Sequence, residues 1–110
     1  MPFTMTPETT NSWIFLAVAI ASSESAITVN GIIGIADGIN HAIPTQKELQ
    51  NAFRWLLKQD LISKEGKKYQ LTDKGLVLFK EGDAKSNLVF GTWDFLKESF
   101  LTLNSEQTRK

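Results

Sequence analysis

The chain has 110 residues, no cysteine, and 12 basic against 12 acidic residues, so its formal net charge is zero. A chain of this length is expected to fold as one domain without disulfide or metal staples. The absence of cysteine excludes disulfide scaffolds, zinc–thiolate sites and cysteine nucleophiles, and it agrees with a reducing compartment.

The charges are unevenly distributed along the chain. Residues 1–43 contain three acidic residues and no lysine or arginine, a net charge of −3. Residues 44–80 contain eight basic and four acidic residues, a net charge of +4, and residues 81–110 contain four basic and five acidic residues, a net charge of −1. A basic middle between acidic flanks indicates an anionic partner, whereas solvated helix faces would explain the same charges without any partner.

The N-terminal part combines an irregular lead with a strongly apolar helix. Residues 1–12 contain two prolines and four threonines, which predicts irregular structure. Asn11 or Ser12 is expected to cap a first helix that runs to about Ser23. This helix has almost no polar face, so we expect it to be buried on most sides.

The apolar run of that helix bears on localisation. Trp13–Ala21 is too short for a membrane span, which needs roughly 18 residues. Ala19-Ile20-Ala21 resembles a signal-peptidase site, but no lysine or arginine precedes it. The sequence therefore predicts a cytoplasmic protein without a membrane partner.

A glycine-rich segment follows. Thr28 is an N-cap candidate, and Gly31, Gly34 and Gly38 lie along one side of the helix that it would begin. Neither a G-x-G-x-x-G after a strand nor a P-loop ending is present, which excludes a phosphate-binding loop. Because each glycine costs roughly 1 kcal/mol of helix propensity relative to alanine, we expect a neighbouring helix to approach closely. Asn40 is expected to be the left-handed residue that ends the helix.

His41 is the only histidine. Without cysteine or a second histidine, a transition-metal site would need converging carboxylates, so a histidine that bonds the backbone or caps the preceding helix is expected instead. Asp37 is near enough in sequence for an acid–base pair, but no nucleophile motif such as G-x-S-x-G accompanies it. The sequence therefore predicts no enzyme, no metal site and no cofactor.

The most periodic helix begins at Thr45-Gln46-Lys47-Glu48, which matches a capping box, and extends to about Gln59. Its apolar stripe is expected to contain Leu49, Phe53, Leu56 and Leu57. Trp55 lies at the edge of the opposite, polar arc.

A hairpin and two further helices complete the pattern. Leu61–Lys64 and Lys68–Leu71 are predicted strands around a turn that contains Gly66. Thr72 is expected to cap a short helix to about Lys80. After a break at residues 81–84, a wide apolar arc predicts a last helix from Leu88, capped by Asn87, to about Leu103.

The stretch "TQKELQNAFRWLLKQDLISKEGKKYQLTDKG" resembles a winged helix-turn-helix domain of the MarR- and PadR-like bacterial regulators. "ELQNAFRWLLKQDLI" is similar to the recognition helix and its exit into the first wing strand, "KKYQL" to the second wing strand, and "LTDKG" to the recurrent LT-x-x-G of the following helix. The similarity covers about residues 28–80. The sequence departs from the family at Asp60, where glycine is usual, and in its glycine-rich helix before the turn.

The expected fold is mainly α with a small β-hairpin wing, a winged helix-turn-helix with an extra apolar N-terminal helix and a long C-terminal helix. The expected organisation is an irregular lead (1–12), a winged-helix domain (13–82), a C-terminal helix available for dimerisation (83–104) and a frayed tail (105–110).

The resemblance implies a small transcriptional regulator that binds double-stranded DNA. Arginine suits guanine, and glutamine and asparagine suit adenine, while lysines suit phosphates. The residues expected to contact nucleic acid are Gln46, Lys47, Gln50, Asn51, Arg54, Lys58, Lys64, Lys67 and Lys68. A solvated helix face, with lysines that protect the hairpin edge, would explain the same residues without any partner. The alternative function is a winged-helix protein–protein interaction module that does not bind DNA, in which the glycine-rich helix and the apolar terminal helices bind the partner.

The apolar terminal helices also suggest a homodimer, which would place two recognition helices about one DNA turn, roughly 34 Å, apart. The residues expected at the dimer interface are Trp13, Phe15, Leu88, Trp93, Phe95, Leu96 and Phe100. The alternative is that the two helices pack on each other within one chain.

Overall fold

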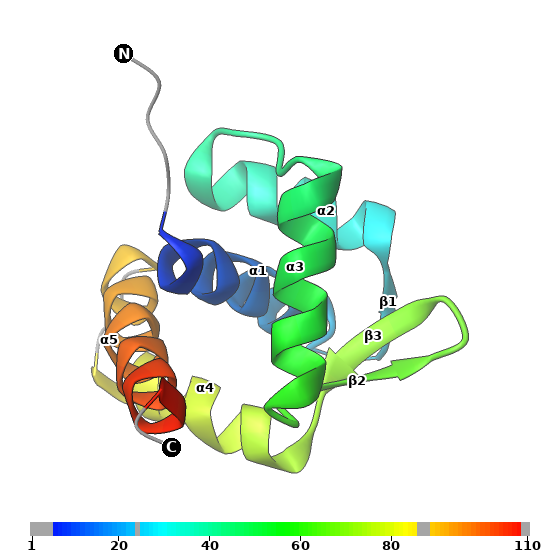
Figure 1. The fold of residues 1–110 in the computed structure, drawn as a ribbon. Helices are drawn as coiled ribbons and strands as arrows, with labels where there is room; N and C mark the ends of the chain where they lie inside the picture. The colour runs from blue at the N-terminus through cyan, green and yellow to red at the C-terminus, as the bar shows by residue number, and fades with distance from the viewer. Residues whose placement is uncertain (1–5, 24, 86–88, 109–110) are drawn as a thin grey trace.

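The computed structural model describes residues 6–23, 25–85 and 89–108, and the side chains of residues 6–23, 25–85 and 91–103. In the described residues the elements follow the order α1 (Pro7–Ala21), β1 (Ile27–Thr28), α2 (Val29–Asn40), α3 (Gln46–Lys58), β2 (Ile62–Glu65), β3 (Lys68–Leu71), α4 (Asp73–Lys85) and α5 (Val89–Thr108) (Figure 1). The protein is thus mainly helical with one small sheet, as the sequence predicts.

The sheet is antiparallel, with strand order β1-β3-β2. The hairpin β2–β3 closes through a two-residue loop, Gly66-Lys67, between the paired residues Glu65 and Lys68. Gly66 has φ 62°, a conformation that glycine adopts without steric cost. Strand β1 is absent from the sequence-based expectation; it pairs Ile27 with Tyr69 and so ties the start of α2 to the hairpin.

Helix α1 begins earlier than expected. Its N-cap is Thr6, whose Oγ1 accepts a hydrogen bond from the Thr9 N–H at 3.3 Å, and Pro7 occupies the first turn, where its missing N–H has no helical role. The predicted irregular lead is therefore wrong for residues 7–12. Ser12 is fully buried and donates to the Glu8 carbonyl at 2.7 Å, which satisfies its hydroxyl inside the helix.

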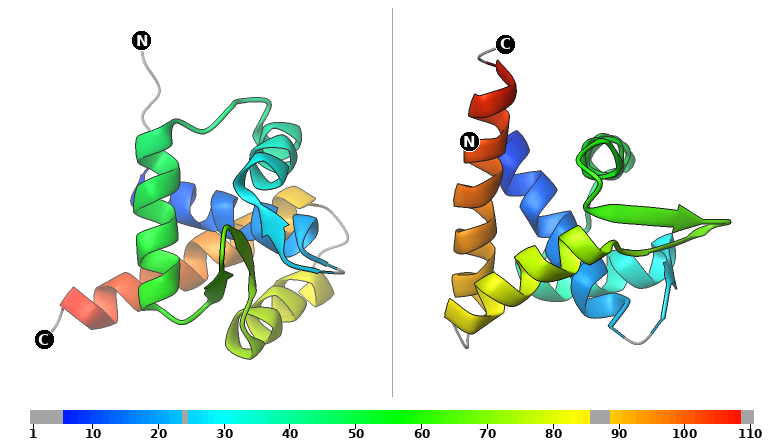
Figure 2. Two further views of the ribbon diagram at one scale, coloured as in Figure 1. Left: turned by 90° about the vertical axis from the view of Figure 1, so that its right-hand side faces the viewer. Right: turned by 90° about the horizontal axis from the view of Figure 1, so that it is seen from below.

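The apolar side of the molecule is built from α1 and α5, which pack on each other (Figure 2). The indole Nε1 of Trp93 donates to Ser12 Oγ at 3.0 Å, and the ring of Phe100 packs edge-on against Phe15 with centroids 5.6 Å apart. Residues 13–18 of α1 are each 1% exposed or less, which confirms that this helix is buried on most sides.

This packing gives most of the residues predicted at the dimer interface a role within the single chain. Five of them are buried within the single chain, because α1 and α5 cover each other's apolar faces: Trp13, Phe15, Trp93, Leu96 and Phe100. Phe95 is half-buried next to the amino group of Lys85, and Leu88 lies outside the described residues. The five buried side chains are at most 7% exposed in the single chain, and the homodimer and its interface stay predictions.

Helix α2 is capped by Thr28 as predicted, but it ends at His41, which has φ 54° and donates its backbone N–H to the Asp37 carbonyl at 2.7 Å. Asn40 is therefore the last helical residue and not the left-handed one. His41 acts as a cap through its backbone.

The expected close approach of a helix to the three glycines is wrong. In the described structure no neighbouring atom lies within 4 Å of a Cβ placed on Gly34 or Gly38, and both glycines are exposed. A Cβ on Gly31 would lie 2.6 Å from Cγ1 of Ile27, so its neighbour is strand β1. Helix α2 contacts α1 through its other face, where the Trp13 indole donates to the Ala36 carbonyl at 2.9 Å.

Candidate nucleic-acid interface

Helix α3 is amphipathic, and its start is fixed by the predicted capping box. The Glu48 N–H donates to Thr45 Oγ1 at 3.0 Å, and the Thr45 N–H donates to Glu48 Oε1 at 2.8 Å. The inward face is formed by Leu49, Ala52, Phe53 and Leu56. The prediction that Leu57 belongs to the inward stripe is wrong. Its side chain is 40% exposed, because it lies a quarter turn away from the centre of that face.

The outward face of α3 carries the polar side chains that the sequence singles out. All six are exposed: Gln46, Lys47, Gln50, Asn51, Arg54 and Lys58. We call these six residues the α3 ridge. They extend from the first to the last residue of the helix, so the ridge is as long as α3 itself.

The hairpin β2–β3 projects from the body of the molecule beside α3 (Figures 1 and 2). The three lysines assigned to it, Lys64, Lys67 and Lys68, are all exposed. Tyr69 points inward from β3 and stacks on Phe53 of α3, with ring centroids 4.3 Å apart and an interplanar angle of 11°. This aromatic pair holds the hairpin against the inward face of α3.

Backbone geometry at the end of α3 sets the direction of the hairpin. Asp60 has φ 61°, a left-handed conformation that glycine adopts at a lower steric cost than aspartate. Thr72, at the end of the hairpin, bonds to the backbone at its start. Its Oγ1 donates to the Asp60 carbonyl at 2.6 Å and its N–H donates to the Leu61 carbonyl at 3.1 Å. Lys74 adds a third bond, from its Nζ to the Gln59 carbonyl at 2.9 Å.

The segment "LTDKG" has a structural role in this arrangement. Thr72 Oγ1 accepts from the Gly75 N–H at 3.0 Å and so caps α4. A Cβ on Gly75 would overlap the carbonyl oxygen of Leu61, so only glycine lets α4 approach the base of the hairpin this closely.

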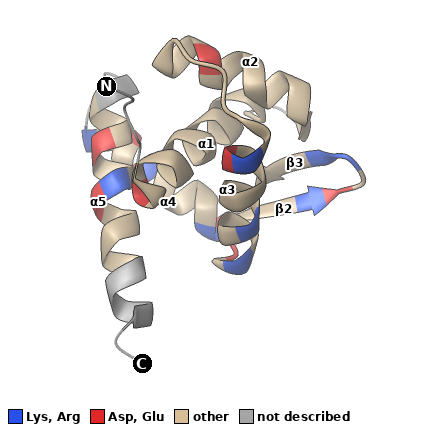
Figure 3. Ribbon diagram, turned by 45° about the horizontal axis from the view of Figure 1, so that its top comes forward, with Lys and Arg blue, Asp and Glu red and all other residues tan. Residues whose placement is uncertain are grey.

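Six of the ten basic residues in the described chain lie on α3 and the hairpin, and the other four lie on α4 and α5 (Figure 3). In the described part of the chain, the one ion pair within 4.0 Å joins Lys97 to Asp94 on α5. The cationic side chains of the α3 ridge and hairpin are therefore not neutralised by ion pairs among the described residues. Lys64 does contact an aromatic ring, with its Nζ 5.8 Å from the centroid of Tyr69.

The structure thus brings all nine predicted contact residues to the surface of two adjoining elements, while nucleic-acid binding by them stays a prediction. Sequence reasoning missed Tyr69, whose alternation with exposed Lys68 in β3 was the available signal. Among the described residues, no three histidine or acidic side chains lie close enough together to hold a metal ion. Within the same residues, every helix is too short or too polar to cross a lipid bilayer.

Comparisons with family models, with curated proteins and with solved structures gave no match to this chain.

Proposed function

We propose that the protein is a winged helix-turn-helix protein that binds double-stranded DNA and acts as a small transcriptional regulator. The order helix, strand, helix, helix, hairpin supports this proposal, as does the pairing of β1 with β3. In it, α3 is the recognition helix and the hairpin β2–β3 is the wing.

The α3 ridge carries the proposal. The major groove of B-DNA is about 12 Å wide and admits one α-helix. Arg54 can donate two hydrogen bonds to guanine, and Gln50 and Asn51 have the paired donor and acceptor that suit adenine. Because Lys47 and Lys58 lie near opposite ends of the helix, each can reach a phosphate at the edge of the groove.

The hairpin contributes charge to the same face. Lys64, Lys67 and Lys68 are exposed on an element that Phe53 and Tyr69 hold beside α3. Lysines suit phosphates, which fix the register of a protein on DNA without reading its sequence. Since the whole chain has no net charge, we expect weak non-specific binding and a strong dependence on the base contacts of α3.

Selection of binding sites from random duplexes at low salt, followed by fluorescence anisotropy on the selected sequence, tests the proposal. Arg54→Ala is expected to weaken binding by about 1–3 kcal/mol and to relax the preference at one base pair. Lys80→Ala is the matched control, because this exposed lysine lies on α4, outside the ridge and the hairpin. Failure to enrich any sequence, or equal losses for the two variants, would contradict the proposal.

A protein-interaction module is the second candidate, and exposed apolar side chains on α4 and α5 favour it. Val77 is 58% exposed and Leu101 is 42% exposed, and a cleft of about 420 Å³ lies between Val77 and Leu103. Binding of a partner to this surface should persist at high salt and should be lost in the Val77→Asp variant. The buried Trp93 and Phe100 cannot serve in this test, since a charge there would disrupt the core.

A further inference from the structure

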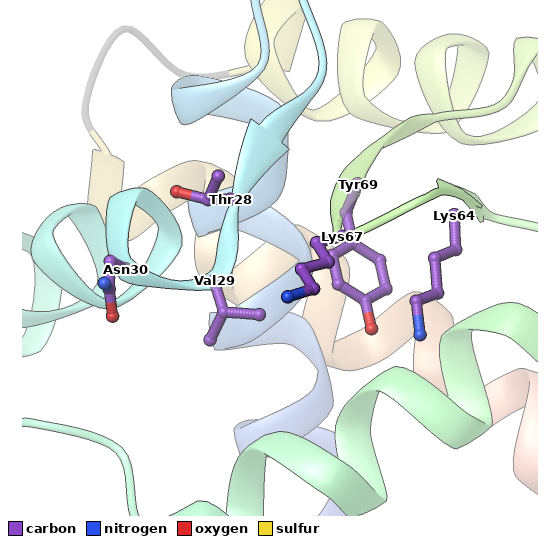
Figure 4. A pocket seen from close by; sticks show the side chains of 6 residues that line it. All are labelled: Thr28, Val29, Asn30, Lys64, Lys67 and Tyr69. Carbon is purple, nitrogen blue, oxygen red and sulfur yellow. The ribbon is translucent and has the colours of Figure 1, made fainter.

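A cleft of about 420 Å³ lies between the start of α2 and the hairpin β2–β3, and six residues line it (Figure 4). They are Thr28, Val29, Asn30, Lys64, Lys67 and Tyr69. We call it the Tyr69 cleft. Its volume falls within the range of small-ligand pockets, about 300–1,000 Å³, so it has room for more than an ordered water.

Tyr69 has a mostly buried ring and presents its hydroxyl to this cleft. The side chain is only 8% exposed, and its ring is fixed by the stacking on Phe53. Its hydroxyl points into the cleft, where solvent reaches it, and it has no hydrogen-bond partner among the described residues (Figure 4). The hydroxyl can therefore donate a hydrogen bond to a ligand atom without breaking a bond within the protein.

The charge of the cleft is entirely positive. Lys64 and Lys67 line it, and none of the six lining residues is acidic. The side chain of Lys67 lies between Tyr69 and Val29, with its amino group directed towards the start of α2 (Figure 4). Within the described residues neither lysine forms an ion pair, so an anion in the cleft would meet two uncompensated charges.

Helix α2 adds backbone donors on the opposite wall. Thr28 Oγ1 accepts from the Gly31 N–H at 3.5 Å, which leaves the N–H groups of Val29 and Asn30, the first two helical residues, without an acceptor in the helix. The positive end of the helix dipole lies at the same place. Anions are favoured at such helix starts.

We propose that the Tyr69 cleft binds a phosphate group. A phosphate offers up to three acceptor oxygens and a charge of roughly −1.5 to −2, which suit a cleft lined by a hydroxyl, two lysines and the first two residues of a helix. The group can belong to the backbone of a DNA duplex or to a small phosphate monoester. Only the first source rests on the proposed function, since the second needs no duplex.

The sole tyrosine of the chain makes the test direct. With ring-¹³C-tyrosine incorporated into the full chain, the ring signals report Tyr69 alone. Titration with inorganic phosphate at constant ionic strength is expected to shift these signals saturably. Lys67→Gln is expected to weaken phosphate binding about tenfold, the loss typical of one charged hydrogen bond. Lys80→Gln, which removes an exposed charge from α4 outside the cleft, the α3 ridge and the hairpin, is expected to leave it unchanged.

Tyr69→Phe keeps the ring that packs on Phe53 and removes only the hydroxyl, so calorimetry with this variant is expected to show weaker phosphate binding by a chain that is still folded. Shifts that never saturate, or equal losses for Lys67→Gln and Lys80→Gln, would overturn the proposal.

Competition between phosphate and a DNA duplex distinguishes the two sources of the phosphate group. If phosphate competes with a duplex, and Tyr69→Phe and Lys67→Gln weaken both, a backbone phosphate occupies the cleft. If phosphate binds saturably but no duplex does, the ligand is a small phosphate ester; the cleft proposal then stands while the DNA-binding function falls. If a duplex binds and the two variants change neither affinity, the cleft proposal is overturned and the DNA-binding function stands.

Discussion

The α3–hairpin region and the α1–α5 region differ in how their sequences encode exposure. Helix α3 has one apolar and one polar face, so its periodicity states which side chains point outward, and the six residues of the α3 ridge are exposed. Helix α1 is apolar on nearly every side, and α2, α3 and α5 together cover it within the same chain. The buried face of an amphipathic helix can therefore be predicted from its sequence. The sequence of a wholly apolar helix predicts only that the helix is covered, and does not predict which element covers it.

The largest expected effect tests the core side of this comparison. Phe100→Ala removes a ring that packs against Phe15 and, with centroids 4.7 Å apart, against Trp55, and it is expected to lower the free energy of unfolding by about 3–5 kcal/mol. Leu101→Ala, one residue further along α5 and 42% exposed, is the matched control, with an expected loss below about 1 kcal/mol. Urea denaturation measures both. Equal losses, together with an unfolding midpoint that rises with protein concentration, would show that α5 packs between chains instead.

Gly75→Ala tests how firmly the core holds the hairpin. The added Cβ would overlap the Leu61 carbonyl oxygen, so α4 or the base of the hairpin has to move. We expect a loss of about 1–3 kcal/mol in the free energy of unfolding, as for other overpacked positions. Thermal denaturation measures it, and an unchanged midpoint would mean that α4 shifts away from Leu61 at little cost.

The elements that the sequence predicts well are those whose signals are local. The capping box of Thr45 and Glu48 and the cap of Thr28 need only residues three apart, and both are present. Strand β1 has two residues, too few for any periodicity, and exists because Ile27 meets Tyr69, 42 positions later. Trp13 and Phe15 pack against Trp93 and Phe100 of α5. These residues are so far apart in the sequence that no local pattern predicts the contacts.

The candidate site shows the same division. The exposed side chains of the α3 ridge follow from helical spacing, whereas the Tyr69 cleft depends on how the hairpin is placed against the start of α2. That placement requires the left-handed backbone of Asp60 and the close approach at Gly75. Neither can be derived from residue type alone, since a positive φ is uncommon for aspartate and a glycine does not show which backbone approaches it.

A smaller effect tests the polar side of the comparison. Lys68→Gln removes a charge from the hairpin outside the Tyr69 cleft, so we expect duplex affinity to fall by a similar factor on every sequence. The slope of log K against log salt should decrease in magnitude by about 1. Anisotropy titrations at several salt concentrations measure the slope. A loss confined to one sequence would assign Lys68 to base contact, and an unchanged slope would remove the hairpin from the interface.

The smallest expected effect concerns the exposed glycines of α2, which belong to neither region. Alanine at Gly34 or Gly38 has open space around its Cβ in the described structure, and neither glycine has a positive φ. Each substitution should therefore raise the free energy of unfolding by about 0.4–1 kcal/mol, because alanine loses less backbone entropy on folding. Calorimetric melting measures this gain, and Gly31→Ala, whose Cβ would meet Ile27, is the control expected to lose stability instead. If Gly34→Ala and Gly38→Ala are more stable but bind the selected duplex or a partner less well, the bare face of α2 is itself a contact surface, and the division into a polar binding region and an apolar core is incomplete.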